Sequence, residues 1–236
     1  MSASDYFAMK RQLTLLHTGA MLIPDFAALA KELLPGVIVR HQLDETLIQN
    51  TIAAGQLEKA TIRRLIKEIE CAREGGADVV MVTCSSLGPA TTLARQVFEF
   101  PILRVDEAMA REAVRTGRRI GVLATLATTL QPTCELVRET AAERQRECEI
   151  VTGLCPGAFE AVMNGDGACH DALVTAGLLE LAAQVDVVVL AQASMARVAA
   201  RIEPGRVVVP VLSSPRFGME HARQVLAALD KGAAVP

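Results

Sequence analysis

Two stretches of this 236-residue chain have nearly the same sequence, and this near-repeat constrains the fold more than any other feature. Asp78–Ser86 reads DVVMVTCSS, and Asp186–Ser194 reads DVVVLAQAS. Each stretch begins with an acidic residue, continues through residues that favour β-strands, and ends in small polar residues. When the two aspartates are aligned, Cys84 falls opposite Gln192. The near-repeat therefore predicts two similar strands that carry different chemistry at their ends.

Two further pairs of landmarks recur in the same order. Thr18 ends an apolar stretch that matches the stretch ending at Thr125, and Pro101 and Pro210 each precede another short apolar run. The pairs are separated by a nearly constant offset of about 108 residues, which indicates duplication of a structural unit. We therefore expect two related halves whose strand ends face each other, with a thiol at one end only.

Short apolar runs alternate with segments of helical periodicity, as is typical of βαβ units and parallel sheets. Runs that are apolar on both faces indicate strands covered by helices on both sides. The expected strands are 12–16, 37–40, 79–83, 102–105, 120–123, 149–151, 187–190 and 207–211. The expected helices are 25–33, 58–74, 129–144, 195–201 and 218–229, with a short helix ending near 98 and others between 157 and 183. The sequence thus predicts an α/β protein of two similar lobes related by pseudo-two-fold symmetry, one formed by 1–105 plus 212–236 and the other by 106–211.

Two details of the helices are also predicted. Pro132 is expected in the first turn of the helix 129–144, where proline is favoured. Asp44 and Glu45 follow the second strand, where they either reach a ligand or cap a helix that starts near Thr46.

Composition excludes several classes of function. A net charge of −3 and an aromatic content of 3% do not match a nucleic-acid-binding surface. No apolar run approaches the roughly 20 residues that span a bilayer, and no signal-peptide core is present, so we expect a cytoplasmic protein without a membrane partner. The six cysteines include no CxxC pair, and we interpret them as free thiols and expect no metal site.

Ligands of open α/β sheets bind beyond the carboxyl ends of the strands. This rule selects the polar and small residues that follow the expected strands, namely Thr18, Cys84, Ser85, Ser86, Thr125, Thr128, Gln192, Ala193 and Ser194. Cys84 is expected near the first turn of a helix, where backbone amides favour the thiolate. The same amides, with the serine hydroxyls, favour a carboxylate or another small anion. Thr125 and Thr128 are candidates for a second anion site.

At these residues the chain resembles the aspartate/glutamate racemase superfamily, which includes hydantoin racemases, maleate isomerases and arylmalonate decarboxylases. The resemblance rests on VTCSS around Cys84, on GVLATLAT from Gly121 to Thr128, and on VLAQASM around Gln192. It implies two α/β lobes that hold a substrate carboxylate between them, no cofactor, and a homo-oligomer. It also implies that Cys84 is the first-lobe cysteine of a pair that the racemases place on opposite faces of the α-carbon.

The second cysteine position carries Gln192, whose amide is not a general base. Racemisation needs one group to remove a proton and another to return it from the opposite face. His17, beside Thr18, is either a substitute base or a hydrogen-bonding wall residue. A single thiol still permits one-sided protonation, or addition to an unsaturated or carbonyl carbon, with Gln192 and the hydroxyls holding an oxyanion.

We therefore predict an enzyme without a cofactor that acts on a small carboxylate through Cys84, as an isomerase, lyase or decarboxylase rather than a two-cysteine racemase. The alternative is a two-lobed protein that binds carboxylates without catalysis. A nucleotide-binding protein is disfavoured, because the chain has neither GxGxxG after its first strand nor GxxxxGK[ST].

Overall fold

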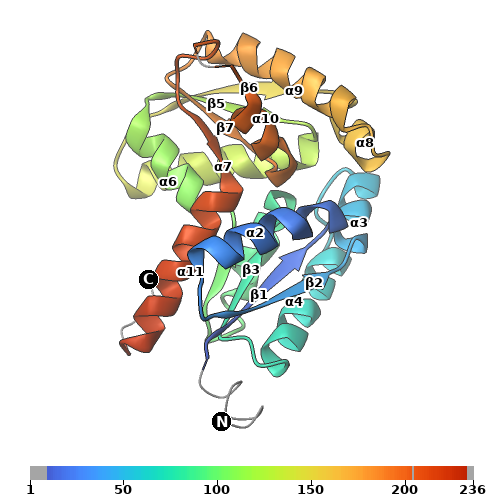
Figure 1. The fold of residues 1–236 in the computed structure, drawn as a ribbon, viewed down its shortest axis with the longest axis vertical. Coiled ribbons are helices and arrows are strands. Elements are labelled where there is room, and N and C mark those ends of the chain that lie inside the picture. The colour runs from blue at the N-terminus through green and yellow to red at the C-terminus, as the bar shows by residue number, and fades with distance from the viewer. Residues whose placement is uncertain (1–9, 204, 233–236) are drawn as a thin grey trace. The chain divides into compact units, whose positions relative to one another are not determined.

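The chain forms two compact α/β units in a computed structural model that describes residues 10–203 and 205–232 (Figure 1). The first unit lies within residues 1–105 and 215–236, and the second lies within residues 106–214. Each unit contains one sheet of four parallel strands. Within the described ranges, no helix combines the length and the apolar composition needed to cross a membrane.

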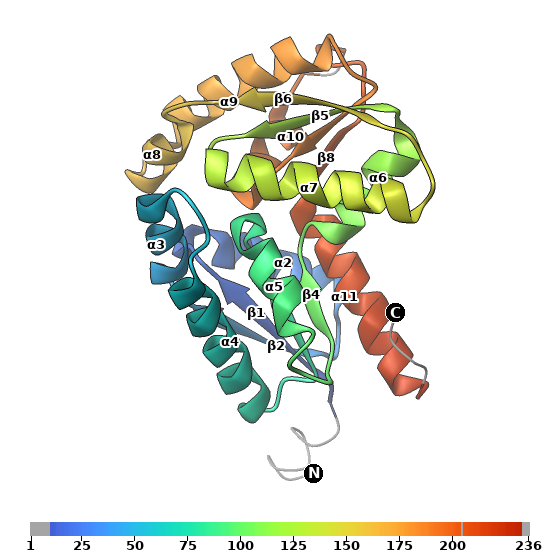
Figure 2. The same ribbon diagram turned by 180° about the vertical axis from the view of Figure 1, so that it is seen from behind.

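The sheet of the first unit has the strand order β2-β1-β3-β4. Its strands are β1 (Gln12–His17), β2 (Ile38–Leu43), β3 (Val79–Val82) and β4 (Ile102–Arg104). The helices of this unit are α2 (Ile23–Leu33), α3 (Thr46–Ala54), α4 (Lys59–Glu74), α5 (Gly88–Ala94) and α11 (Ser214–Asp230). Figure 2 shows α4 and α5 on one face of this sheet. All four residues of β3 are buried, which explains the continuous apolar run in the sequence.

The second unit repeats this topology, with the strand order β6-β5-β7-β8. Its strands are β5 (Arg119–Ala124), β6 (Glu149–Leu154), β7 (Val187–Leu190) and β8 (Val211–Ser213). Its helices are α6 (Glu107–Thr116), α7 (Ala127–Glu143), α8 (Ala158–Met163), α9 (Gly167–Ala182) and α10 (Ala196–Arg201). Helix α9 covers one face of the sheet, and α6 and α7 cover the other (Figure 1). The predicted α/β class and the predicted pair of similar lobes are confirmed.

The aspartates that open the two near-identical stretches have the same structural role. The Asp78 carboxylate accepts a hydrogen bond of 2.8 Å from the backbone N–H of Gln12. The Asp186 carboxylate accepts hydrogen bonds of 2.9 and 2.8 Å from the N–H groups of Arg118 and Arg119. Each aspartate thus holds the start of the neighbouring central strand, β1 or β5. The repeated aspartate is therefore a feature of the fold rather than of the chemistry at the strand ends.

Helix α11 returns the chain to the first unit. The Arg11 guanidinium contacts the far end of this helix, with bonds of 3.1 Å to the Leu229 carbonyl and 2.7 Å to the Asp230 carboxylate. Near its start, a Cβ added to Gly218 would lie 2.8 Å from the Val105 carbonyl oxygen. The helix is therefore packed closely along the end of β4 and pinned at the edge of the unit.

Several element predictions differ from the structure. The strand expected at 207–211 begins only at Val211, where pairing with β7 starts, and Val208 is 90% exposed. The valines of 207–211 favoured a longer strand, but a segment forms a strand only where its backbone pairs with a neighbouring strand. Helix α6 was not predicted from the sequence. Helix α7 begins at Ala127, so Pro132 lies in its second turn and not in its first.

Candidate active site

Cys84 lies two residues after β3, at the start of the 3₁₀ turn η2 (Ser85–Leu87), which leads directly into α5. Its backbone is extended, and its carbonyl accepts a hydrogen bond of 3.1 Å from the N–H of Leu87. The strand therefore ends at Cys84, and the chain turns so that amide groups gather around the side chain. The residue is partly exposed.

Four donors surround the Cys84 sulfur. They are the hydroxyls of Thr18 and Ser86 and the backbone N–H groups of Ser86 and Leu87. Burial raises the pKa of the thiol, whereas each of these hydrogen bonds lowers it, and the net shift is upward. Cys84 is therefore protonated at neutral pH. The donors are arranged to stabilise the thiolate that remains after the proton has been given away.

The other residues selected in the first unit lie next to this sulfur or just below it. Thr18 follows β1 and is buried, and Ser85 and Ser86 are buried in the turn after Cys84. His17, the last residue of β1, is fully buried. Its Nδ1 lies 2.9 Å from the Thr83 hydroxyl, and its Nε2 lies 2.9 Å from Nδ1 of His41. Both ring nitrogens of His17 are therefore engaged, as expected for a hydrogen-bonding wall residue.

The Asp44 side chain caps a helix. It accepts hydrogen bonds from the backbone N–H of Thr46, at 3.0 Å, and from the Thr46 hydroxyl, at 2.6 Å, and it also pairs with Arg64. Although burial raises it, the pKa of Asp44 is held below its usual value by these partners. The capping interpretation of Asp44 is thus the one that the structure supports. Glu45 accepts a hydrogen bond of 3.2 Å from the Ala20 N–H.

At the corresponding position of the second unit, the Gln192 amide is clasped to Thr125. The Thr125 N–H donates to Gln192 Oε1 at 2.6 Å, and Gln192 Nε2 donates to the Thr125 hydroxyl oxygen. These two bonds join the end of β7 to the end of β5. Because Thr125 accepts through its hydroxyl oxygen, its own proton is left to donate elsewhere. Gln192 therefore holds the two strand ends together and presents Thr125 as a donor.

Thr128 lies in the first turn of α7, close in sequence to this clasp. Its buried hydroxyl has no hydrogen-bond partner among the residues that the structure describes. Pro132, four residues later, has no N–H to give to the Thr128 carbonyl. Ala193 is buried in the turn η3 (Ala193–Met195) that follows Gln192, and Ser194 is partly exposed there. The Thr128 hydroxyl is thus a donor at the start of α7 that the described residues leave unused.

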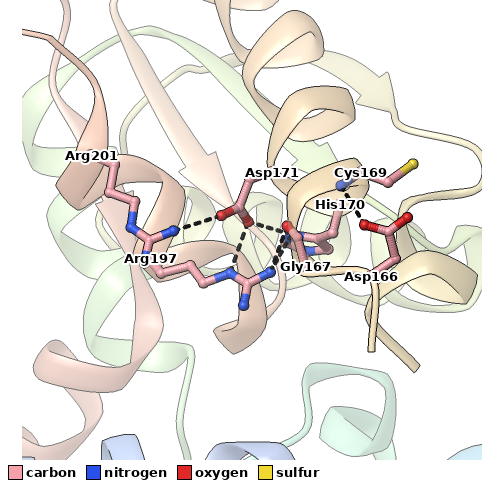
Figure 3. A network of polar contacts seen from close by, with 7 residues as sticks. All are labelled: Asp166, Gly167, Cys169, His170, Asp171, Arg197 and Arg201. Carbon is pink, nitrogen blue, oxygen red and sulfur yellow. Dashed lines mark hydrogen bonds and ion pairs between the residues drawn. The ribbon is translucent and has the colours of Figure 1, made fainter. Parts of the chain in front are cut away.

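A charged network fastens α10, the helix that follows η3, to α9 (Figure 3). The Asp171 carboxylate accepts from Nε of Arg197 at 2.8 Å, from Arg201 at 3.0 Å and from Nδ1 of His170 at 2.9 Å. Although burial raises it, the pKa of Asp171 is held below its usual value by the bonds from His170 and Arg197. Helix α10 has only six residues, so the network supplies an anchor that its own length does not. It thereby supports the turn that carries Gln192.

Sequence reasoning missed His41, Thr83 and the partners of His170. His17 and His41 lie on adjacent parallel strands, so the strand order β2-β1 was the missing signal. Cys71 and Cys169 are exposed. Among the described residues, no cluster of three or more histidine, cysteine, aspartate or glutamate side chains is placed to hold a metal ion.

Comparisons with known proteins identify the family. The sequence profile of the Asp/Glu/Hydantoin racemase family matches residues 17–222, and the chain belongs to this family. No curated protein matches it.

Solved structures share the fold. Glutamate racemase isoform RacE1 from Bacillus anthracis is 19% identical, with a TM-score of 0.74, over 94% of this chain and 83% of that one. Allantoin racemase from Klebsiella pneumoniae is 15% identical, with a TM-score of 0.66, over 96% and 91%. A mutant of arylmalonate decarboxylase in a sulfate-associated form is 20% identical, with a TM-score of 0.53, over 94% of each chain.

Proposed function

We propose that this protein is an enzyme without a cofactor that transfers a proton to or from a small carboxylate through the single thiol of Cys84. The observation that carries the proposal is the set of four hydrogen-bond donors around the Cys84 sulfur. When a carboxylate substrate loses CO2, the electron pair of the broken C–C bond leaves a planar enediolate; the protonated thiol gives its proton to one face of that carbon, and the four donors then hold the thiolate until water protonates it again. Thr18, Ser85 and Ser86 complete the candidate site of the first unit.

The chemistry of Gln192 favours an isomerase or lyase over a symmetric racemase. Its amide does not titrate in the range where a general base works, and both ends of the amide are bonded to Thr125. We propose that Thr125, Thr128, Ser194 and the N–H groups near Ala193 bind a carboxylate group. The unpartnered hydroxyl of Thr128 supports this role. The resemblance to the racemases further leads us to propose a homo-oligomer, which sedimentation measurements would test.

The experiment is an NMR screen of small mono- and dicarboxylates in deuterated water. We expect the wild-type protein to produce solvent deuterium incorporation, decarboxylation or double-bond movement with one class of acid. Cys84→Ser is expected to stop the reaction while leaving the circular dichroism spectrum unchanged. Cys148→Ser is the matched control, since Cys148 is also partly exposed. Unlike Cys84, it precedes the amino end of a strand, β6, and so lies away from the carboxyl ends of the strands. Undiminished turnover in Cys84→Ser would remove the thiol from the reaction.

A second candidate function is binding without catalysis, and the fixed Gln192 amide favours it. If this candidate is right, carboxylates bind with a heat that calorimetry detects, and the NMR screen shows no chemical change. Weaker binding in Thr128→Val than in the wild type would place the carboxylate at the start of α7. Deuterium incorporation into any bound acid would exclude the candidate.

A further inference from the structure

A chain of buried polar side chains lies beneath Cys84 in the first unit. The Thr83 hydroxyl donates to the Leu16 carbonyl at 3.1 Å, and His17 joins Thr83 to His41 through two contacts of 2.9 Å. Thr83 and His17 are buried, and His41 is partly exposed. The His17 ring also packs against Phe26 and is stacked on His41. None of these side chains is needed for the proton transfer proposed above.

The hydrogen bonds between these side chains all run in one direction, from His41 through His17 and Thr83 to the Leu16 carbonyl. Thr83 has a single hydroxyl proton and gives it to Leu16, so its oxygen accepts from Nδ1–H of His17. Burial and the nearby His41 lower the pKa of His17 to about 4, so its ring is neutral near pH 7. Nε2 of His17 is then an acceptor, and Nδ1 of His41 must donate to it. The tautomer of His17 is thus fixed by its neighbours.

These hydrogen-bonded side chains join the ends of β1 and β3, the two strands that lead to Thr18 and Cys84. Leu16 and His17 lie at the end of β1, immediately before Thr18, and Thr83 lies immediately before Cys84. The Thr18 hydroxyl is one of the donors to the Cys84 sulfur. Thr83 and its two partners lie one or two residues before Cys84 and Thr18 on their strands. The contacts of Thr83 with Leu16 and His17 therefore fix the distance between Thr18 and Cys84.

The second unit provides an internal comparison. At the offset of the repeat, Ala124 stands where the first unit has His17, and Ala191 stands where it has Thr83. Both alanines are fully buried. There the strand ends are joined directly by the Gln192–Thr125 clasp. The buried polar chain thus occurs in the unit that has a thiol in place of the bridging amide.

We propose that His17 is a positioning residue that acts through Thr83 to hold the Cys84 thiol within hydrogen-bond reach of Thr18. The importance of this role for turnover rests on the proposed function, but the position of the thiol can be measured without a substrate. A thiol is a weak bridge between strands, whereas the Gln192 amide makes two bonds. The layer beneath Cys84 supplies the contact that an amide would have made.

The test follows alkylation of Cys84 by iodoacetamide against pH, because the midpoint of this profile reports the thiol pKa. Cys71, Cys148 and Cys169 are first replaced by Ser, since they are exposed or partly exposed. Thr83→Val removes the hydroxyl and keeps the shape of the side chain, and Thr83→Ser restores the hydroxyl. Thr51→Val is the matched control, because Thr51 is equally buried but bonds only its own helix at the Leu47 carbonyl.

We expect Thr83→Val to move the midpoint upward by roughly one pH unit, because the Thr18 donor is no longer held at the sulfur. Thr83→Ser and Thr51→Val are expected to keep the midpoint of the parent protein. An unchanged midpoint in folded Thr83→Val would overturn the proposal. If Thr83→Val does not fold, His17→Asn and His17→Leu replace it, since Asn retains a donor near the Nδ1 position and Leu does not. Equal midpoints in these two variants would likewise overturn it.

The same data separate this inference from the proposed function. A shifted midpoint in Thr83→Val, together with no turnover by the wild-type protein, would support positioning and reject the enzyme. Turnover that requires Cys84, together with an unshifted midpoint, would support the enzyme and reject positioning. In an active protein, Thr83→Val is expected to lower kcat with little effect on KM, because the thiol is misplaced and carboxylate binding is not.

Discussion

The ends of β3 and β7 occupy equivalent places in two units of the same topology, yet they are stabilised in different ways. At the end of β7, one side chain bridges two strands, and the layer beneath it is alanine. At the end of β3, the equivalent side chain is a thiol, and a threonine and two histidines form the connection below it. The comparison shows that where a thiol replaces the bridging amide, neighbouring side chains connect the two strands instead. Four predictions test it, in order of decreasing effect.

The largest expected difference is in turnover. Cys84→Ser is expected to reduce kcat by at least about 100-fold, because general acid–base groups contribute factors of this size. Gln192→Ala is expected to reduce kcat/KM by only about 10-fold, since it releases the Thr125 donor from its clasp and removes no proton carrier. Steady-state rates of both single variants and of the double variant are the measurement. Equal losses in the two single variants would break the contrast between the strand ends.

The second prediction concerns pH and applies only to the first unit. Because His17 has a pKa of about 4 when folded and about 6.5 when unfolded, its burial as a neutral ring stabilises the protein above pH 6.5. This stabilisation is lost as the pH falls from 6.5 towards 4, and about 2 kcal/mol of it is lost by pH 5. Urea unfolding of the wild type and of His17→Gln at pH 7 and pH 5 is the check. A fall in stability of the same size in His17→Gln would show that other groups cause it.

The third prediction concerns the close packing of α9 on the sheet of the second unit. A Cβ at Gly177 would lie 2.7 Å from the Cys155 sulfur and 3.3 Å from a Leu123 methyl group. The first unit has Ile69 at the equivalent position of α4. Gly177→Ala is therefore expected to lower the free energy of unfolding by about 1 to 2 kcal/mol. Cys155→Ala in the same chain is expected to restore part of the loss, and a double variant no more stable than Gly177→Ala would count against this packing.

The smallest expected effect is at the surface of the α9–α10 network. Arg201→Ala is expected to lower the free energy of unfolding by less than about 0.5 kcal/mol, because the Arg201 side chain is 72% exposed. Arg197→Ala is expected to cost more, since its guanidinium bonds both Asp171 and the Gly167 carbonyl. Thermal unfolding of the two variants gives the order. A larger loss for Arg201→Ala would contradict this assignment of the anchor.

The sequence predicted the class of fold because the features that determine it are local. Runs such as 79–82 and 187–190 are apolar on both faces, which is readable without coordinates. Strand 207–211 was placed too early, because valines outside a ladder resemble valines inside one. The start of α7 was misplaced because Pro132 is tolerated in the second turn, where the lost N–H leaves one carbonyl without its helical partner.

The candidate site residues were selected by their position at strand ends, but their partners were not. The clasp between Gln192 and Thr125 joins residues 67 positions apart. The pairing of His17 with His41 depends on which strands are neighbours, and a single sequence does not state the strand order. The upward pKa shift of Cys84 depends on burial, which spacing does not reveal. Position along a strand is thus local information, and the chemical state of a side chain is not.

The return of α11 to the first unit has a consequence for synthesis on the ribosome. The second unit is continuous in sequence, so all of its described elements are synthesised before most of α11 is. The first unit begins earlier but is completed later, because the contacts of Arg11 and Val105 with α11 form only after α11 has been synthesised. Domains usually fold in the order in which they emerge, N-terminal first. Here the strand end that carries the thiol belongs to the discontinuous unit, so this unit lacks part of its packing until α11 has been synthesised.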